Sequence, residues 1–117
     1  MKILCTVAVG LIVVPVALAQ VPIKKYEQFK KDPSFKNYID GVATGFLVAN
    51  VELDRRKKPL LYCQPPNLAM NTEMYLSILD KKVKERESTV PADLPVELLL
   101  LEGLTEALPC GKPPRRR

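Results

Sequence analysis

The sequence predicts a small all-α domain of four helices, closed by one disulfide and preceded by a cleaved signal peptide. Three observations support this prediction: apolar residues recur at helical spacing, prolines and capping residues separate the periodic segments, and strand-like alternation never lasts more than a few residues. The expected organisation is a signal peptide at 1–19, a helical domain at 20–110 and a disordered basic tail at 111–117.

Residues 1–19 have the composition of a secretory signal peptide. A lysine at the second position precedes an apolar run at 3–18, and small residues stand just before Gln20. We expect cleavage after Ala19, so that the mature chain begins at Gln20 and carries no membrane span. The alternative, an uncleaved membrane anchor, is disfavoured because Pro15 interrupts a run shorter than the roughly 20 residues of a bilayer span.

The first two helices are expected on either side of an Asp-Pro pair. A short polar helix should occupy 21–31, because Asp32 and Pro33 end its pattern. The central helix should follow from an N-cap at Ser34 to about Glu52. Its apolar residues recur at i, i+3, i+4, i+7 and predict one buried stripe of Phe35, Tyr38, Ile39, Val42, Phe46 and Ala49.

Gly41 and Gly45 lie one turn apart in this central helix. A glycine inside a helix costs about 1 kcal/mol relative to alanine, so we expect a compensating close approach of a neighbouring helix at this face. Two other interpretations fit the same spacing. The glycines are simply tolerated, or they mediate self-association, which is less favoured than packing within the chain.

The third helix is expected from an N-cap at Asn71 or Thr72 to about Arg86. Glu73 would then lie favourably near the positive end of the helix dipole. The buried side of this helix should consist of Tyr75, Ile78, Leu79 and Val83.

The fourth helix is expected to be capped by Asp93, with Pro95 in its first turn, where no intrahelical donor is lost. Pro109 should end it just before Cys110. Its apolar face is broad and comprises Val96, Leu99, Leu100, Gly103, Leu104, Ala107 and Leu108.

Cleavage of the signal peptide would remove Cys5 and leave Cys63 and Cys110 as the cysteines of the mature chain. Export brings them into an oxidising compartment, where we expect them to pair. The bond would close a loop of nearly fifty residues, which should stabilise the fold by roughly 4 kcal/mol. The alternative is two free thiols.

Charge and composition disfavour several functional classes. The net charge of +5 is due entirely to Lys2 and four cations of the C-terminal tail, so no basic face for nucleic acid is indicated. The chain has no histidine and no Gly-rich phosphate loop, calcium loop or serine-elbow motif. We therefore expect no enzyme activity, no metal and no cofactor, and we expect the domain to act by binding.

A run of charges separates the second and third helices. It reads Asp54, Arg55, Arg56, Lys57 and Lys58, followed by a proline. Such a run cannot be core, and a solvated loop is the favoured interpretation. The alternative is a docking patch for an acidic surface, which makes these five residues the candidate partner-binding residues.

Three short motifs occur in the order Tyr38-Ile39-x-Gly41-Val42, then Tyr62-Cys63 followed by Pro65-Pro66, and finally Leu108-Pro109-Cys110. Over 35–110 the chain thereby resembles the Rap/Tai type of immunity protein. The resemblance implies a small helical protein of the periplasm, plausibly a homodimer, that binds and neutralises a peptidoglycan amidase effector delivered by type VI secretion.

Two further functions are compatible with the same features. One is an acid-stress chaperone of the periplasm similar to the HdeA type, which is also small, helical and held by one disulfide. Such a protein exposes apolar surface when acid protonates its carboxylates. The other is a structural or adaptor protein of the cell envelope without a toxin partner.

Overall fold

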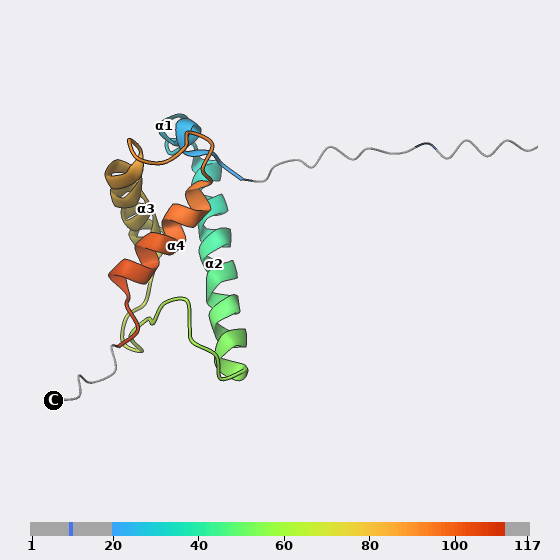
Figure 1. Ribbon diagram of the computed structural model, residues 1–117, viewed down its shortest axis with the longest axis vertical. Coiled ribbons are helices and arrows are strands. Elements are labelled where there is room, and N and C mark those ends of the chain that lie inside the picture. The colour runs from blue at the N-terminus through green and yellow to red at the C-terminus, as the bar shows by residue number, and fades with distance from the viewer. Residues whose placement is uncertain (1–9, 11–19, 112–117) are drawn as a thin grey trace, which may run out of the picture.

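Four α-helices and one 3-10 turn make up the described part of this computed structural model, which is Gly10 and residues 20–111 (Figure 1). The elements are η1 at Ile23–Lys25, α1 at Tyr26–Phe29, α2 at Pro33–Arg55, α3 at Thr72–Arg86 and α4 at Val96–Ala107. Within the described residues the pairing of extended segments is limited to one isolated bridge, between Pro22 and Pro95. The predicted all-α class is confirmed.

Two predicted segments lie outside the described residues. They are the signal peptide, apart from Gly10, and residues 112–117 of the tail. The predicted first helix at 21–31 takes the form of η1 followed by α1.

The start of α2 differs from the prediction. Asp32, and not Ser34, is the N-cap, because Asp32 Oδ1 accepts hydrogen bonds from Ser34 N at 2.9 Å and from Ser34 Oγ at 2.8 Å. Pro33 occupies the first helical position, where its fixed φ suits the helix and its missing N–H costs nothing. The helix also runs beyond the predicted end at Glu52 and ends at Arg55.

The start of α3 agrees with the prediction, whereas the start of α4 does not. Asn71 caps α3 by accepting a hydrogen bond from Met74 N at 2.9 Å. Asp93 does not cap α4, which begins after an extended Pro95 with no side-chain cap. Instead, Val96 N donates to the carbonyl oxygen of Val21 at 2.8 Å, so the N-terminal segment satisfies this amide.

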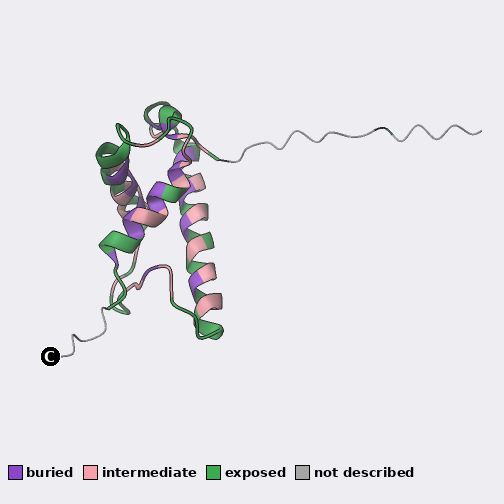
Figure 2. Ribbon diagram, in the orientation of Figure 1, coloured by how far each residue is buried: buried purple, intermediate pink, exposed green. Residues whose placement is uncertain are grey.

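The core lies where α2, α3 and α4 face one another, as the buried residues of Figure 2 indicate. Helices α3 and α4 form the most extensive contact between helices, and α2 packs across them. Each fully buried aliphatic side chain contributes roughly 1.5 to 3 kcal/mol of transfer free energy. The largest fully buried side chains are Tyr62, Ile39, Leu79, Leu99, Leu100, Leu104, Val83 and Val96.

The predicted disulfide between Cys63 and Cys110 is present, with 4.7 Å between the two Cα atoms. Beside it, Cys63 N donates to the carbonyl oxygen of Leu108 at 2.8 Å. The bond therefore ties the segment that follows α2 to the end of α4.

The expected packing of a helix against Gly41 and Gly45 is wrong for this chain. Both glycines are exposed, and a Cβ atom at either position would meet nothing within 4 Å. The buried stripe of α2 includes Ile39 and Ala43, and helical geometry turns the two glycines away from it. The close helix approach occurs at Gly103 instead, where a Cβ would lie 2.6 Å from Ile78 Cγ2.

Candidate functional site

The described residues contain neither a cluster of metal-ligating side chains nor a membrane-spanning helix. Among them, no group of three or more His, Cys, Asp or Glu side chains is arranged to hold a metal ion. None of the helices in this part of the chain is long and apolar enough to cross a membrane. Exposed apolar and charged side chains on the surface define the candidate site.

One such surface lies on the second half of α2. Leu47 is 44% exposed, Val48 62% and Val51 65%, which is high for side chains of this size. Together with Gly41 and Gly45 we call them the α2 apolar face. Residues 41–51 carry no charge at all. Apart from Thr44 and Asn50 the segment is also apolar or glycine, and a contiguous exposed apolar patch is typical of protein interaction sites.

A groove of about 240 Å³ adjoins this face. It lies between the second half of α2 and the segment that follows the helix. Three aliphatic side chains and four polar or aromatic ones line it: Leu47, Asn50, Val51, Asp54, Leu60, Tyr62 and Gln64.

Asn50 holds the two sides of the groove together by hydrogen bonds. Its side chain is buried at 7% exposure, and it bridges α2 to the returning segment. Its Nδ2 donates to the carbonyl oxygen of Tyr62 at 2.9 Å, and its Oδ1 accepts from Leu61 N at 2.7 Å. Sequence reasoning did not single out Asn50. Its position could have identified it, because Asn50 is a polar residue where the apolar stripe of α2 predicts a buried side chain, and a buried amide needs hydrogen-bond partners.

The predicted partner-binding residues lie together at the end of α2. Asp54 and Arg55 are in its last turn and not in a loop, and all five residues of 54–58 are exposed. Glu52 binds two of the cations, with Arg55 Nη2 at 2.7 Å and Arg56 Nε at 2.7 Å from its Oε1. These hydrogen bonds, that from Arg55 above all, lower the pKa of the Glu52 carboxyl.

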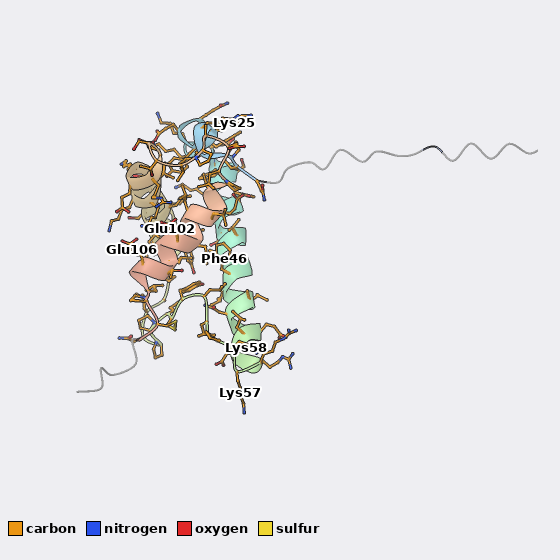
Figure 3. The ribbon with its side chains drawn as sticks, viewed as in Figure 1. Lys25, Phe46, Lys57, Lys58, Glu102 and Glu106 are labelled. Atoms are coloured by element: carbon orange, nitrogen blue, oxygen red, sulfur yellow. A yellow bond between two sulfur atoms is a disulfide. The ribbon has the colours of Figure 1, made fainter. Side chains whose placement is uncertain are left out.

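Lys57 and Lys58 remain as free charges of this turn. Figure 3 shows both at the end of α2, with Lys57 extending away from the body of the molecule, and neither forms an ion pair with another described residue. We call residues 54–58 the cationic turn. The turn borders the groove through the Asp54 carboxylate, and the two lysines follow three and four positions later.

Lys57 adopts a conformation that is usual for glycine. Its φ is 55°, in the left-handed region. Lys57 N donates to the carbonyl of Asp54 and Lys58 N to that of Leu53, both at 2.9 Å, which is the hydrogen-bond pattern of a Schellman motif. A side chain at this position costs about 1 kcal/mol. This left-handed conformation could not be predicted from the sequence, because position 57 is a lysine and not a glycine.

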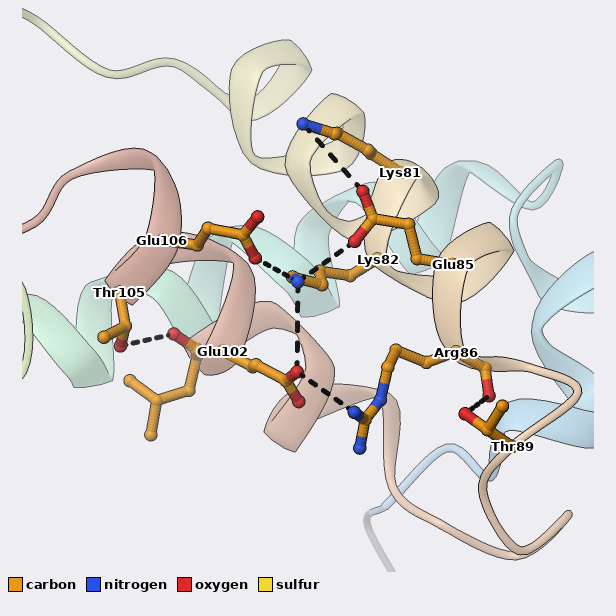
Figure 4. Close-up of polar contacts among 9 residues, drawn as sticks. Lys81, Lys82, Glu85, Arg86, Thr89, Glu102, Thr105 and Glu106 are labelled. Carbon is orange, nitrogen blue, oxygen red and sulfur yellow. Dashed lines mark hydrogen bonds and ion pairs between the residues drawn. The ribbon is translucent and has the colours of Figure 1, made fainter.

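A second cluster of charges joins α3 to α4 (Figure 4). The Lys82 side chain is 9% exposed, and its ammonium contacts the carboxylates of Glu106, Glu85 and Glu102, the last two at 3.0 and 3.9 Å. Glu106 first, and then Glu85, raise the pKa of Lys82 against the opposing effect of desolvation. Arg86 extends the cluster to Glu102 at 3.8 Å.

This cluster is a structural contact. Its three carboxylates are all ion-paired, so none of them is free to act as a base. Sequence reasoning left Lys82 unassigned. Its spacing from Tyr75 and Leu79 places it on the buried side of α3, which is the signal that identifies it.

The motifs that carry the family resemblance are divided between core and surface, and Gly41, Pro65, Pro66, Pro109 and Cys110 are exposed. Ile39 is fully buried, as is Tyr62, and Leu108 is 9% exposed, while Cys63 and Cys110 form the disulfide. The three buried residues and the disulfide stabilise the fold, whereas Gly41 belongs to the α2 apolar face.

Comparisons with protein-family models, with curated proteins and with solved structures found no match. The fold and the surface together describe a small, disulfide-closed helical domain whose α2 apolar face adjoins the cationic turn.

Proposed function

We propose that this protein is a binding protein of the periplasm that neutralises a peptidoglycan amidase effector of type VI secretion, as its resemblance to the Rap/Tai immunity proteins implies. The observation that carries the proposal is the combination of exposed Leu47, Val48 and Val51 with the free charges of Lys57 and Lys58. An apolar patch bordered by charged side chains has the composition of a protein–protein interface. The proposal requires no catalytic group and no cofactor.

The two parts of the surface have different tasks in this proposal. The apolar side chains at the groove supply affinity, because they are removed from water when the partner binds. The cationic turn attracts an acidic partner surface and increases the association rate, an effect that salt screens.

The test uses an amidase effector encoded next to the gene for this protein. The exported, disulfide-bonded protein should bind the purified effector and stop its hydrolysis of peptidoglycan. Replacing both Lys57 and Lys58 with alanine should weaken binding about tenfold at low salt and reduce its salt dependence. Lys24 and Lys25 form the matched control, because they are also exposed lysines and Figure 3 places Lys25 at the opposite end of the molecule.

The control pair replaced by alanine should bind as the wild type does. Failure of the wild-type protein to bind or inhibit the effector would remove the immunity role. An equal loss in both lysine pairs would remove the cationic turn from the contact.

Self-association is the second part of the proposal. Gly41 and Gly45 have no Cβ, so a second copy of α2 can approach this side closely, with Val48 packed at the centre of the contact. Val48→Asp should then shift a concentration-dependent dimer to monomer in light scattering. Leu98, which is 53% exposed on α4, provides the control Leu98→Asp. A wild-type protein that is monomeric at all concentrations would exclude the dimer.

The alternative function, an acid-stress chaperone, is favoured by one observation. Hydrogen bonding to Lys82 lowers the pKa of the Glu106 carboxyl, so acid would protonate Glu106 and weaken the contact between α3 and α4. The chaperone function predicts that binding of an apolar dye and protection of an unfolded client both increase from pH 7 to pH 2. Absence of both increases would exclude this function.

A further inference from the structure

The first residues of the described domain run antiparallel to the segment that leads into α4. Ile23 N donates to the carbonyl of Leu94, and Val96 N donates to that of Val21, both at 2.8 Å. Pro22 and Pro95 form an isolated antiparallel bridge. This register pairs Val21 with Val96, and its next step places Gln20 opposite residue 97.

Residue 97 is a glutamate, and only one of its two carboxylate oxygens accepts a hydrogen bond. Its Oε1 accepts a hydrogen bond from Val21 N at 3.3 Å. Its Oε2 is buried and has no hydrogen-bond partner, and the side chain forms no ion pair with another described residue. A buried carboxylate oxygen without a donor is costly, so a partner is expected for it.

We propose that this partner is the α-ammonium group of Gln20, which exists only after the signal peptide has been cleaved after Ala19. The inference goes beyond the proposed function and rests on the predicted cleavage site. Before cleavage, the nitrogen of Gln20 is a neutral amide with one N–H. After cleavage it is a cation with three donors. Cleavage of the signal peptide thus creates the positively charged partner that the Glu97 carboxylate lacks.

The covalent geometry permits one carboxylate to accept from both nitrogens. Nitrogens of consecutive residues lie roughly 3 to 3.6 Å apart, as the standard backbone bond lengths dictate. With Val21 N on Oε1 of Glu97, the ammonium of Gln20 therefore reaches Oε2 by a small rotation of an exposed terminal residue. The ion pair would fasten the mature N-terminus onto the first turn of α4.

Asp93 is the competing acceptor. It lines a shallow groove with Gln20, Pro22, Lys24 and Lys25, and it is exposed. The hydrogen-bond register favours Glu97, because the segment at 21–23 already lies along 94–96. Asp93→Asn is therefore the matched control for Glu97→Gln, since each substitution removes one negative charge beside the N-terminus.

The experiment uses protein that cells have exported and processed. Glutaminyl cyclase converts an N-terminal glutamine to pyroglutamate: the α-amine attacks the side-chain amide carbon, a C–N bond forms and ammonia leaves. This reaction removes the positive charge and changes little else. Melting temperatures are then measured before and after cyclisation in the wild type, Glu97→Gln and Asp93→Asn.

Cyclisation should lower the melting temperature by about 4 °C in the wild type and in Asp93→Asn, and should leave that of Glu97→Gln unchanged. The docked amine should also react several-fold more slowly in the wild type than in Glu97→Gln. Equal shifts in all three proteins, or no shift in the wild type, would overturn the inference. A mature chain that begins elsewhere than Gln20 would overturn it as well.

If Glu97→Gln does not accumulate, the wild type alone still tests the inference. Its Gln20 should be cyclised several-fold more slowly than that of a free peptide of residues 20–24. Equal rates would show that the amine is not docked.

Discussion

Lys82 of α3 lies directly against Gly103 of α4, so that a Cβ atom at Gly103 would be only 3.0 Å from Lys82 Cγ. The same Cβ would be 2.6 Å from Cγ2 of Ile78. The missing side chain thus allows the two helices to approach closely. This approach brings the Lys82 ammonium, which also pairs with Glu85 of its own helix, to the carboxylate of Glu106 on α4. The glycine and the ion pairs belong to one contact.

Gly103→Ala should therefore destabilise the protein. Helix propensity alone would stabilise it by up to about 1 kcal/mol, but overpacking against a β-branched side chain costs roughly 1 to 3 kcal/mol. Urea unfolding should show a net loss of about 1 kcal/mol or more. Gly45→Ala is the matched control, because nothing lies within 4 Å of its Cβ position, and it should be neutral or stabilising. Equal effects of the two substitutions would contradict the close approach at Gly103.

The helices and the disulfide were predictable because local signals specify them. Amphipathic periodicity indicated α2, α3 and α4, and Asn71 was recognisable as an N-cap because its side chain acts within its own turn. The cysteine pairing was predictable from the expected export and from the number of cysteines. The helices and the cap depend on residues that are near one another in sequence, and the disulfide depends on the number of cysteines in the expected mature chain.

The missed features depend on contacts between distant segments. Gly41 and Gly103 are both glycines in apolar helices, and only the packing of α3 reveals that Gly103 is the one approached closely. The start of α4 was mispredicted for the same reason, because Val21 supplies the acceptor that Asp93 was expected to provide. At the candidate site, the charges of 54–58 were predictable from sequence, whereas the exposure of Val48 and Val51 was not.

Asn50→Ala should cost about 2 to 3 kcal/mol of unfolding free energy. The substitution leaves Leu61 N and the carbonyl of Tyr62 without their partner in a largely buried position. Asn37→Ala is the control in the same helix, because Asn37 is exposed, and it should change stability by no more than about 0.5 kcal/mol. A similar small effect of Asn50→Ala in urea unfolding would mean that its two hydrogen bonds do not hold the groove.

Lys57→Gly should stabilise the protein by about 1 kcal/mol, because glycine adopts a positive φ without the steric cost of a Cβ. Lys58→Gly removes the same charge at a neighbouring position without a positive φ, and it should give no gain. The comparison of urea midpoints separates the backbone effect from the charge effect. A Lys57→Gly protein that is more stable and yet binds the proposed effector less tightly would assign the strained lysine to recognition.

Acid should destabilise the fold through Asp80. A hydrogen bond from Lys84, reinforced by one from the Tyr26 hydroxyl at 3.0 Å, lowers the pKa of this carboxyl below its ordinary 3.8. The unfolded chain therefore binds the proton more readily than the folded one, so stability is complete above about pH 5 and falls as the pH drops below about 4. Asp80→Asn should lower stability at neutral pH and flatten this dependence, measured by urea unfolding between pH 7 and pH 3. An equally steep acid loss in the variant would assign the pH dependence to other carboxylates.

The disulfide between Cys63 and Cys110 should supply a large share of the stability of so small a domain. The two cysteines are separated by 47 positions in sequence, so the bond restricts a long stretch of the unfolded chain. Cys110→Ala should cost roughly 2 to 5 kcal/mol, compared with the 5 to 15 kcal/mol typical of a whole domain. It also leaves Cys63 as an unpaired thiol, which an oxidising compartment converts to intermolecular disulfides.

Cys5→Ala is the control for this prediction, because Cys5 lies in the predicted signal peptide and is absent from the expected mature chain. Its exported product should match the wild type in mass and in urea midpoint. Mass spectrometry of the unreduced wild-type protein should find a chain that begins at Gln20 and is two hydrogens lighter than its reduced form. Two free thiols in that sample would contradict the pairing. The stability that the bond supplies would then have to come from the helix contacts alone, which a mature chain of this length provides only marginally.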